Sequence, residues 1–143
     1  MVIYYNTHIL YLFIYIFSYY EVPPGFQFLH CIKNEASGGG NVFVDAIKGA
    51  LLLKETKPLS FKLLSSVYTS YHKQGKDHSL AYRRPVIQLN DQNEVIAINY
   101  SPPFLGTLAI PYDIVQDYYN AWNDFTKVQT HIYIVTKLNI KRY

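Results

Sequence analysis

The spacing of hydrophobic residues along this chain changes between two periods, and each period predicts a different kind of element. Over residues 45–56 and again over 112–126, apolar residues recur at helical spacing, which predicts two amphipathic helices. A shorter helix is predicted over 59–66, after the Lys57-Pro58 step that breaks the first one. Asp45 is placed to cap the first helix, and Pro111 opens the last one, since a first turn tolerates proline. The positions expected to face inward are Ala46, Ile47, Ala50, Leu51, Leu53, Leu59, Leu63, Leu64, Ile114, Val115, Tyr118, Ala121, Trp122 and Phe125.

Strongly apolar or β-branched runs between turn residues predict strands. The run over 26–32 predicts a buried strand, because Val22-Pro23-Pro24-Gly25 precedes it and Gly38-Gly39-Gly40-Asn41 follows it as turns. Residues 42–45 then run out as a second strand. Further along the chain, strands are expected over 67–71, 82–89 and 94–100.

Two connections between these later strands have clear turn chemistry. The polar residues 73–77 predict a loop, and Asn90-Asp91-Gln92-Asn93 predicts a hairpin turn between the last two strands. Pro85 lies inside one predicted strand, where it indicates a sheet edge or a bulge. Strands with helical inserts indicate an α+β or mixed β architecture.

Composition narrows the class of protein. A chain of 143 residues, half of them hydrophobic, has the length of one domain and enough apolar surface for a modest core. The net charge of +3 is mild and the lysines are scattered, so nucleic acid is not an expected partner. The single cysteine, Cys31, cannot form an internal disulfide, which fits an intracellular compartment, cytoplasmic or mitochondrial. We expect Cys31 to be buried and unreactive.

The two ends of the chain differ in composition from its middle. Tyr, Ile, Leu, Phe and Val dominate the start, which holds six of the fifteen tyrosines within twenty residues. We therefore expect a domain over 19–128, with flanks at 1–18 and 129–143 that are not native to it, from translated non-coding sequence or a mis-joined gene. A β-strand is the second interpretation of the first flank, and a membrane span, which needs roughly 20 apolar residues, is the third.

A set of short motifs in the middle of the chain resembles one enzyme family. These motifs are Tyr19-Tyr20-Glu21, Pro24-Gly25, Gln27-Phe28-Leu29-His30-Cys31, Gly38-Gly39, Val44-Asp45, Leu63-Leu64-Ser65, Ile98-Asn99-Tyr100 and Tyr118-Tyr119-Asn120-Ala121. In this order they resemble the carnitine-biosynthesis oxygenases, gamma-butyrobetaine dioxygenase and trimethyllysine dioxygenase, of the taurine-dioxygenase-like group. The resemblance implies an incomplete double-stranded β-helix, or jelly roll, and Fe(II)- and 2-oxoglutarate-dependent hydroxylation of a trimethylammonium substrate. The Tyr-Tyr-Glu and Gln-Phe-Leu-His-Cys runs favour gamma-butyrobetaine.

The same resemblance places no iron ligand in this chain. Enzymes of this family bind Fe(II) with two histidines and one carboxylate. Their His-x-Asp pair falls on Ile14 and Ile16, whose alkyl groups cannot donate lone pairs, and no His-Gly-Arg sequence supplies the second histidine. Leu29 matches a position that lines the family's 2-oxoglutarate pocket. We therefore expect no catalytic or metal-binding residue here, and neither Fe(II) nor 2-oxoglutarate bound.

Other residues with suitable chemistry have simpler explanations. His72, Asp77 and His78 could converge on a metal, but a solvated loop is the favoured interpretation. His30 is expected to be a packed core histidine, and His8 and His131 lack a carboxylate at a useful spacing. Tyr19 and Tyr20 could border a quaternary-ammonium pocket, although packing is the favoured role.

Two classes of function therefore remain. The first is an oxygenase of this family represented by an incomplete or mis-joined chain, with a small-molecule substrate. The second is a non-enzymatic remnant or membrane-anchored interaction module that keeps the scaffold without iron. A homodimer is compatible with both, and a membrane partner is not expected.

Overall fold

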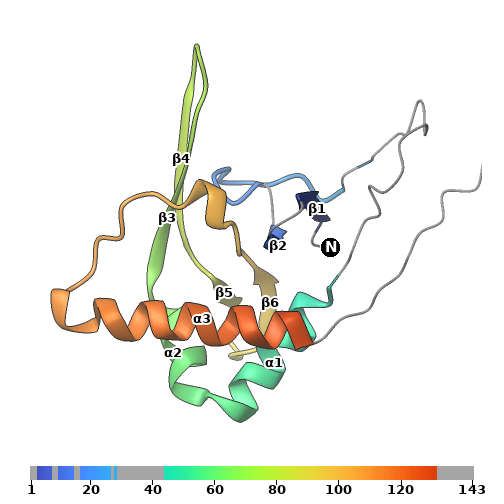
Figure 1. Ribbon diagram of the computed structural model, residues 1–143. Coiled ribbons are helices and arrows are strands. Elements are labelled where there is room, and N and C mark those ends of the chain that lie inside the picture. Colours follow the sequence, from blue (N-terminus) through green and yellow to red (C-terminus); the bar gives the residue numbers. More distant parts are fainter. Residues whose placement is uncertain (1–2, 8–9, 15–16, 27, 29–43, 132–143) are drawn as a thin grey trace, which may run out of the picture.

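The computed structural model describes residues 3–7, 10–14, 17–26, 28 and 44–131. The helices and strands are, in order, β1 (Ile3–Thr7), β2 (Leu10–Ile14), α1 (Ala46–Thr56), α2 (Pro58–Ser66), β3 (Tyr68–Gln74), β4 (Ser79–Pro85), β5 (Ile87–Leu89), β6 (Val95–Ile98) and α3 (Val115–His131). Two short 3-10 turns, η1 (Pro102–Phe104) and η2 (Tyr112–Ile114), lie between β6 and α3. Figure 1 shows α3 lying across the region of α1, α2, β5 and β6, while the β3–β4 hairpin projects away from it.

All three predicted helices are present, and their ends follow from local chemistry. The Asp45 carboxylate accepts a hydrogen bond from the Lys48 N–H at 3.0 Å, so it caps α1 as expected. Lys57 ends α1 by donating its N–H to the Leu53 carbonyl, and Pro58 begins α2 directly afterwards. The last helix follows η2 and continues beyond the predicted residue 126 to His131.

The inward positions are correct for most of α3 but partly wrong for α1 and α2. Ala50, Leu53, Leu64, Tyr118, Ala121, Trp122 and Phe125 are buried. Ile47, Leu51 and Leu59 are exposed instead, with 44%, 46% and 77% of their surface accessible, and Phe61 is buried in α2.

The cause in α1 is its close approach to α3. A Cβ added at Gly49 would lie 2.3 Å from Nε2 of Gln129, so the absence of a side chain there lets the two helices meet. Gln129 also donates to the Ala46 carbonyl at 3.3 Å. The buried stripe of α1 is therefore centred on Gly49, Ala50 and Leu53, which turns Ile47 and Leu51 outward.

The described strands pair two by two, in three antiparallel sheets: β1 with β2, β3 with β4, and β5 with β6. The mixed helical and antiparallel architecture is as expected, while closure into a jelly roll remains an expectation from the resemblance. The predicted strand over 82–89 is wrong as a single element, because β4 ends at Pro85 and β5 starts at Ile87. Pro85 has no N–H for a ladder, and beyond it the chain changes partner from β3 to β6.

The hairpin turn over 90–93 is confirmed, whereas the loop over 73–77 is shorter than expected. In the turn, the Asn90 side chain accepts from the N–H groups of Gln92 and Glu94, and Asn93 adopts a positive φ of 59°. Strand β3 continues through Gln74, because its pairing with β4 extends to the Gln74–Ser79 pair.

The prediction of a buried strand over 26–32 is wrong at the two positions that can be judged. Phe26 and Phe28 lie outside any strand, and 86% and 90% of their surface is accessible. In a strand, positions i and i+2 lie on the same face, so Phe26 and Phe28 would share one face. Both rings are exposed, so that face is not buried. Residues 27, 29–32, 42 and 43 lie outside the described residues, and Val44 forms a single bridge.

The first flank forms a β-hairpin over its described part, which agrees with the second interpretation of that segment. Strands β1 and β2 pair antiparallel, with Ile14 opposite Ile3. Within the described ranges, no helix is long and apolar enough to cross a membrane.

An aromatic cluster joins α3 to the end of β6. The Tyr100 ring stacks on Trp122 with centroids 4.7 Å apart and meets Phe125 edge to face at 5.5 Å. Apolar residues from α1, α2, β5 and β6 complete this core: Ala50, Leu53, Phe61, Leu64, Val86, Ile87 and Ile98. Burial of this shared surface is what holds the three helices on the β5–β6 hairpin.

Replacing Phe125 with alanine should therefore unfold the core at a lower urea concentration. Phe125 is fully buried, and loss of such a ring costs about 3–5 kcal/mol of unfolding free energy. The matched control is Phe28→Ala, which removes an exposed ring and should shift the stability by less than about 0.5 kcal/mol. Equal effects in urea titrations followed by tryptophan fluorescence would contradict this core assignment.

Candidate functional site

The segment from Phe17 to Glu21, just after the positions where the resemblance led us to expect the first two iron ligands, is anchored on the β3–β4 hairpin. The Arg84 side chain of β4 is 7% exposed and donates from Nη2 to the carbonyl oxygens of Tyr20 and Glu21, the latter at 3.0 Å. Its guanidinium also lies 4.5 Å from the centre of the Tyr82 ring. Arg84 thus fixes the backbone of residues 20–21 with a charged, buried donor.

Tyr19 packs, as the favoured interpretation expected. It is 2% exposed, and its ring meets Phe104 edge to face at 4.9 Å and lies 5.0 Å from the Tyr20 ring. The Lys73 ammonium sits 5.3 Å from the centre of the Tyr19 ring, within the range of a cation–π contact. Tyr20 is partly exposed beside it.

Three buried tyrosines form hydroxyl contacts between the hairpin, β6 and α3. Tyr118 is hydrogen-bonded to Thr69, Tyr71 donates to the Asn99 carbonyl, and Tyr100 is bonded to Thr126 at 2.6 Å. Burial raises the pKa of Tyr118 to about 12, raises that of Tyr71 well above its usual value, and raises that of Tyr100. These phenols stay neutral at physiological pH and serve as structural hydrogen-bonding groups.

The candidate metal cluster of His72, Asp77 and His78 does not form. Nε2 of His72 is hydrogen-bonded to Oγ of Ser79 at 2.8 Å across the hairpin, and all three residues are exposed. His131, also exposed, is bonded through Nδ1 to the Lys127 carbonyl at 2.7 Å. No group of three His, Cys, Asp or Glu residues able to hold a metal ion occurs in the part of the chain that the structure describes.

The positions singled out by the resemblance can be located only in part. Ile14 is the last residue of β2 and pairs with Ile3. Ile16, Leu29, His30, Cys31 and His8 lie outside the described residues. An Fe(II) centre of this type needs nitrogen and carboxylate donors converging on one point, and no group of three such donors occurs within the described ranges.

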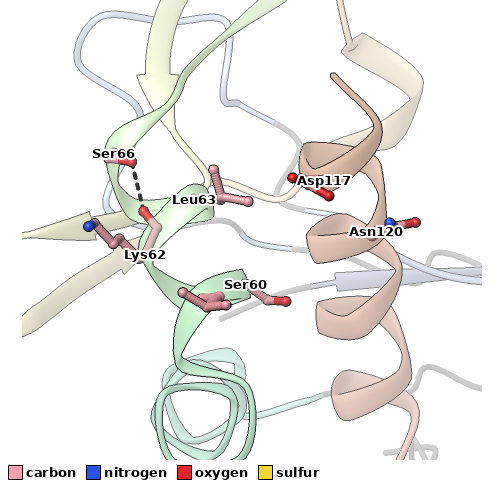
Figure 2. Close-up of a pocket in the computed structure, with 7 residues that line it drawn as sticks. Ser60, Lys62, Leu63, Ser66, Asp117 and Asn120 are labelled. Atoms are coloured by element: carbon pink, nitrogen blue, oxygen red, sulfur yellow. Dashed lines mark hydrogen bonds between the residues drawn. The ribbon is translucent and has the colours of Figure 1, made fainter. Parts of the chain in front are cut away.

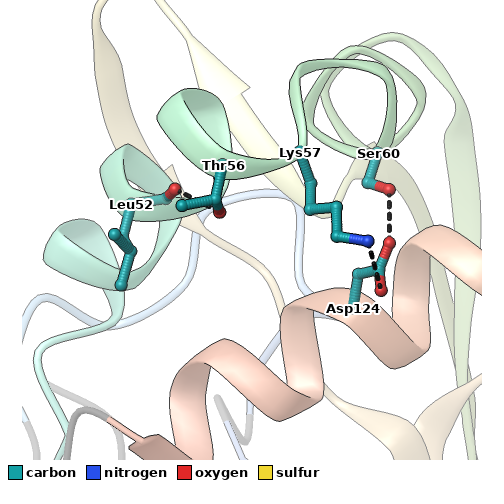
Figure 3. Close-up of polar contacts among 5 residues, drawn as sticks. All are labelled: Leu52, Thr56, Lys57, Ser60 and Asp124. Atoms are coloured by element: carbon teal, nitrogen blue, oxygen red, sulfur yellow. Dashed lines mark hydrogen bonds and ion pairs between the residues drawn. The ribbon is translucent and has the colours of Figure 1, made fainter.

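A groove between α2 and α3 was not predicted from the sequence. This groove has a volume of about 420 Å³ and is lined by Leu59, Ser60, Lys62, Leu63, Ser66, Asp117 and Asn120. Figure 2 shows the side chains from the two helices facing it. One end of the seam between the helices is closed, because Asp124 accepts from Ser60 at 2.8 Å and pairs with Lys57 at 3.9 Å (Figure 3). The sequence feature that could have predicted this groove is the apolar pair Leu59 and Leu63, four residues apart on α2, although the helical spacing predicts that both lie in the core.

The groove lacks the chemistry of a catalytic site. Its charged groups, Lys62 and Asp117, lie on different helices, and the structure gives no ion pair between them. It holds no histidine, and the hydroxyls of Ser60 and Ser66 are engaged with Asp124 and the Lys62 carbonyl. The groove is therefore a surface depression rather than an active site.

Comparison with known proteins places these features in one family. Residues 17–135 match the family described as taurine catabolism dioxygenase TauD, TfdA family. Relatives include a dioxygenase of Strobilurus tenacellus, 33% identical over 110 residues, which are 77% of this chain and 26% of the relative. Gamma-butyrobetaine dioxygenase of Homo sapiens is 34% identical over 107 residues, covering 72% of this chain and 28% of the relative. Mitochondrial trimethyllysine dioxygenase of Bos taurus is 29% identical over 119 residues, covering 77% and 28%. The chain thus spans about a quarter of the length of these relatives.

The raised pKa of Tyr118 predicts a loss of stability in alkali. Between the ordinary value near 10 and the folded value of about 12, the unfolded chain releases this proton while the folded chain keeps it. Stability is therefore unaffected below pH 10 and falls by up to about 2–3 kcal/mol as the pH rises to 12. Urea titrations across this range should show a shallower pH dependence for Tyr118→Phe than for the parent chain. Identical slopes would contradict the burial of this phenol.

Arg84→Lys should loosen the anchored segment selectively. A lysine keeps the charge but lacks the planar guanidinium that reaches both carbonyls, so amides of residues 17–22 should exchange with deuterium at least about tenfold faster. Amides of α3 should keep their protection. Arg83→Lys is the matched control, because Arg83 is exposed and donates to the Tyr68 carbonyl at 3.3 Å rather than to residues 17–22. A uniform change across the chain would argue against a local anchor.

Proposed function

We propose that this chain, which belongs to the TauD/TfdA family of dioxygenases, carries part of the scaffold of an Fe(II)- and 2-oxoglutarate-dependent dioxygenase but does not itself form the iron site. The observation that carries the proposal is the family match over residues 17–135, which contains the whole packed core of α1, α2, α3, β5 and β6. On this proposal, the sequence keeps part of the family's scaffold but lacks the residues that bind iron.

The substrate class proposed for the parent reaction is a small trimethylammonium compound. Two of the relatives are named for gamma-butyrobetaine and for trimethyllysine, and both names denote oxygenases. The higher identity to gamma-butyrobetaine dioxygenase, and the Tyr-Tyr-Glu and Gln-Phe-Leu-His-Cys runs, favour gamma-butyrobetaine. When bound, the Fe(II) and 2-oxoglutarate of such enzymes supply the oxidising chemistry.

The absence of a site in this chain is proposed from the residues that stand at the ligand positions. The resemblance leads us to expect the family's His-x-Asp pair at Ile14 and Ile16, and the sequence contains no His-Gly-Arg. Several buried polar groups near the anchored segment have structural partners: Nη2 of Arg84 is bonded to backbone carbonyls, and the tyrosine hydroxyls are bonded to Thr69, Asn99 and Thr126. We still propose, from the resemblance, that Leu29 corresponds to a residue lining the family's 2-oxoglutarate pocket.

The direct experiment is an anaerobic calorimetric titration of the purified 143-residue chain with Fe(II) in the presence of 2-oxoglutarate. We expect no stoichiometric binding, because alkyl side chains offer no lone pair to the metal. Human gamma-butyrobetaine dioxygenase serves as the positive control. A stoichiometric signal of micromolar affinity from this chain would contradict the proposal.

The double variant Ile14→His, Ile16→Asp tests whether the missing pair is the only defect. It restores two donors of one pair, but an iron centre of this type also needs a second histidine. We therefore expect no hydroxylation of gamma-butyrobetaine or trimethyllysine, measured as succinate formation coupled to substrate. Turnover by this variant would show that the chain holds the remaining site.

A further inference from the structure

The outer edge of β4 is an open row of backbone hydrogen-bonding groups. The Gly75 N–H donates to the His78 carbonyl at 2.7 Å, so Gly75 and His78 are a hydrogen-bonded pair. This pair fixes which of the following β3–β4 pairs are hydrogen-bonded and which are not. Since hydrogen-bonded pairs alternate with non-bonded pairs, Leu80, Tyr82 and Arg84 direct their backbone groups toward β3. Ser79, Ala81 and Arg83 therefore direct theirs outward.

The other edge of the hairpin supports this assignment. By the same alternation, Ser70 of β3 points outward, and its carbonyl does accept from the Gly106 N–H at 2.9 Å. The nearby pair Tyr71 and Leu105 forms a bridge, so part of the β3 edge is covered. At the β4 edge, no hydrogen bond from the described part of the chain reaches the outward groups of Ser79, Ala81 or Arg83.

This edge has few of the usual devices that prevent pairing with another strand. Natural edges are protected by bulges, by proline or by charged side chains, and two-stranded sheets alone are only marginally stable. The β3–β4 pairing is regular over seven residues of each strand, and Pro85 comes only at its end. The Arg83 guanidinium turns toward the β3 side, where it donates to the Tyr68 carbonyl. The hairpin projects from the helices, so another chain has access to it (Figure 1).

We propose that the outer edge of β4 is an interface at which two copies of this chain pair antiparallel, forming a four-stranded sheet. The sequence of β4 is self-complementary in the register that places Ala81 opposite Ala81 of the second copy. Ser79 then faces Arg83 of the second copy, so no like charges oppose each other. Each of these pairs exchanges two backbone hydrogen bonds.

The inner face of the sheet is complementary in the same register. Leu80 and Tyr82 are half-buried in the single chain, and Leu80 would lie opposite Tyr82 of the second copy. An aromatic–aliphatic cross-strand pair of this kind stabilises a sheet, and here it occurs twice by symmetry. This proposal goes beyond the proposed function, because edge pairing involves neither iron nor substrate.

Sedimentation equilibrium of the full chain and of Ala81→Pro tests the interface. Proline at 81 removes an outward N–H but no hydrogen bond within the hairpin, so the fold should survive, as checked by circular dichroism. We expect a reversible dimer for the parent chain and a single-chain mass for the variant at the same concentration. A parent chain that stays monomeric, or assembly that Ala81→Pro does not weaken, would overturn the proposal.

Two substitutions of opposite charge at position 79 test the register without introducing a proline. Ser79→Glu places a carboxylate opposite Arg83 of the second copy, whereas Ser79→Lys places a cation there. Both lose the same bond to His72, so the comparison isolates the contact between copies. We expect the dissociation constant of the dimer to be roughly tenfold lower for the glutamate variant than for the lysine variant. Equal dissociation constants would overturn the proposed register.

Discussion

The contact between α3 and the remainder of the core is the interaction on which the described structure depends. Trp122 and Phe125 enclose the Tyr100 ring, so a helix late in the chain is joined to the end of β6. Gly49 lets α1 approach α3 closely enough for Gln129 to reach the Ala46 carbonyl. None of these elements could bury its apolar face alone, which is why the β5–β6 hairpin and the three helices form one packed unit.

Polar contacts then position the outlying parts on that unit. Asp124 joins α3 to the start of α2 through Ser60 and Lys57. Arg84 ties the segment around Tyr20 to the β3–β4 hairpin, and the hairpin is itself bonded to α3 through Thr69 and Tyr118. The region around Tyr20 is therefore held by the scaffold through a short chain of buried groups.

The sequence predicted the helices and the hairpin turn well, because their signals are local. Asp45, Pro58 and the Asn90 turn each act on neighbouring backbone groups, so their effect can be derived without the fold. The exposure of Ile47, Leu51 and Leu59 could not be derived in this way, since it depends on where α3 crosses. The division of the predicted strand at Val86 follows from a change of pairing partner, and partner choice is not encoded in one strand. For the site, the ligand positions remain a prediction from the resemblance, whereas the anchoring role of Arg84 could not be predicted, because it depends on contacts between residues more than sixty positions apart.

We propose that this chain folds part of the family's scaffold independently of an iron centre. Hydrogen–deuterium exchange of the purified chain, with and without Fe(II) and 2-oxoglutarate under argon, tests that claim most directly. The account predicts strong protection in α1, α3, β5 and β6 that is unchanged by the additions, and no new protection in residues 10–21. Protection that appears in β2 or around Tyr20 only when Fe(II) and 2-oxoglutarate are present would contradict it.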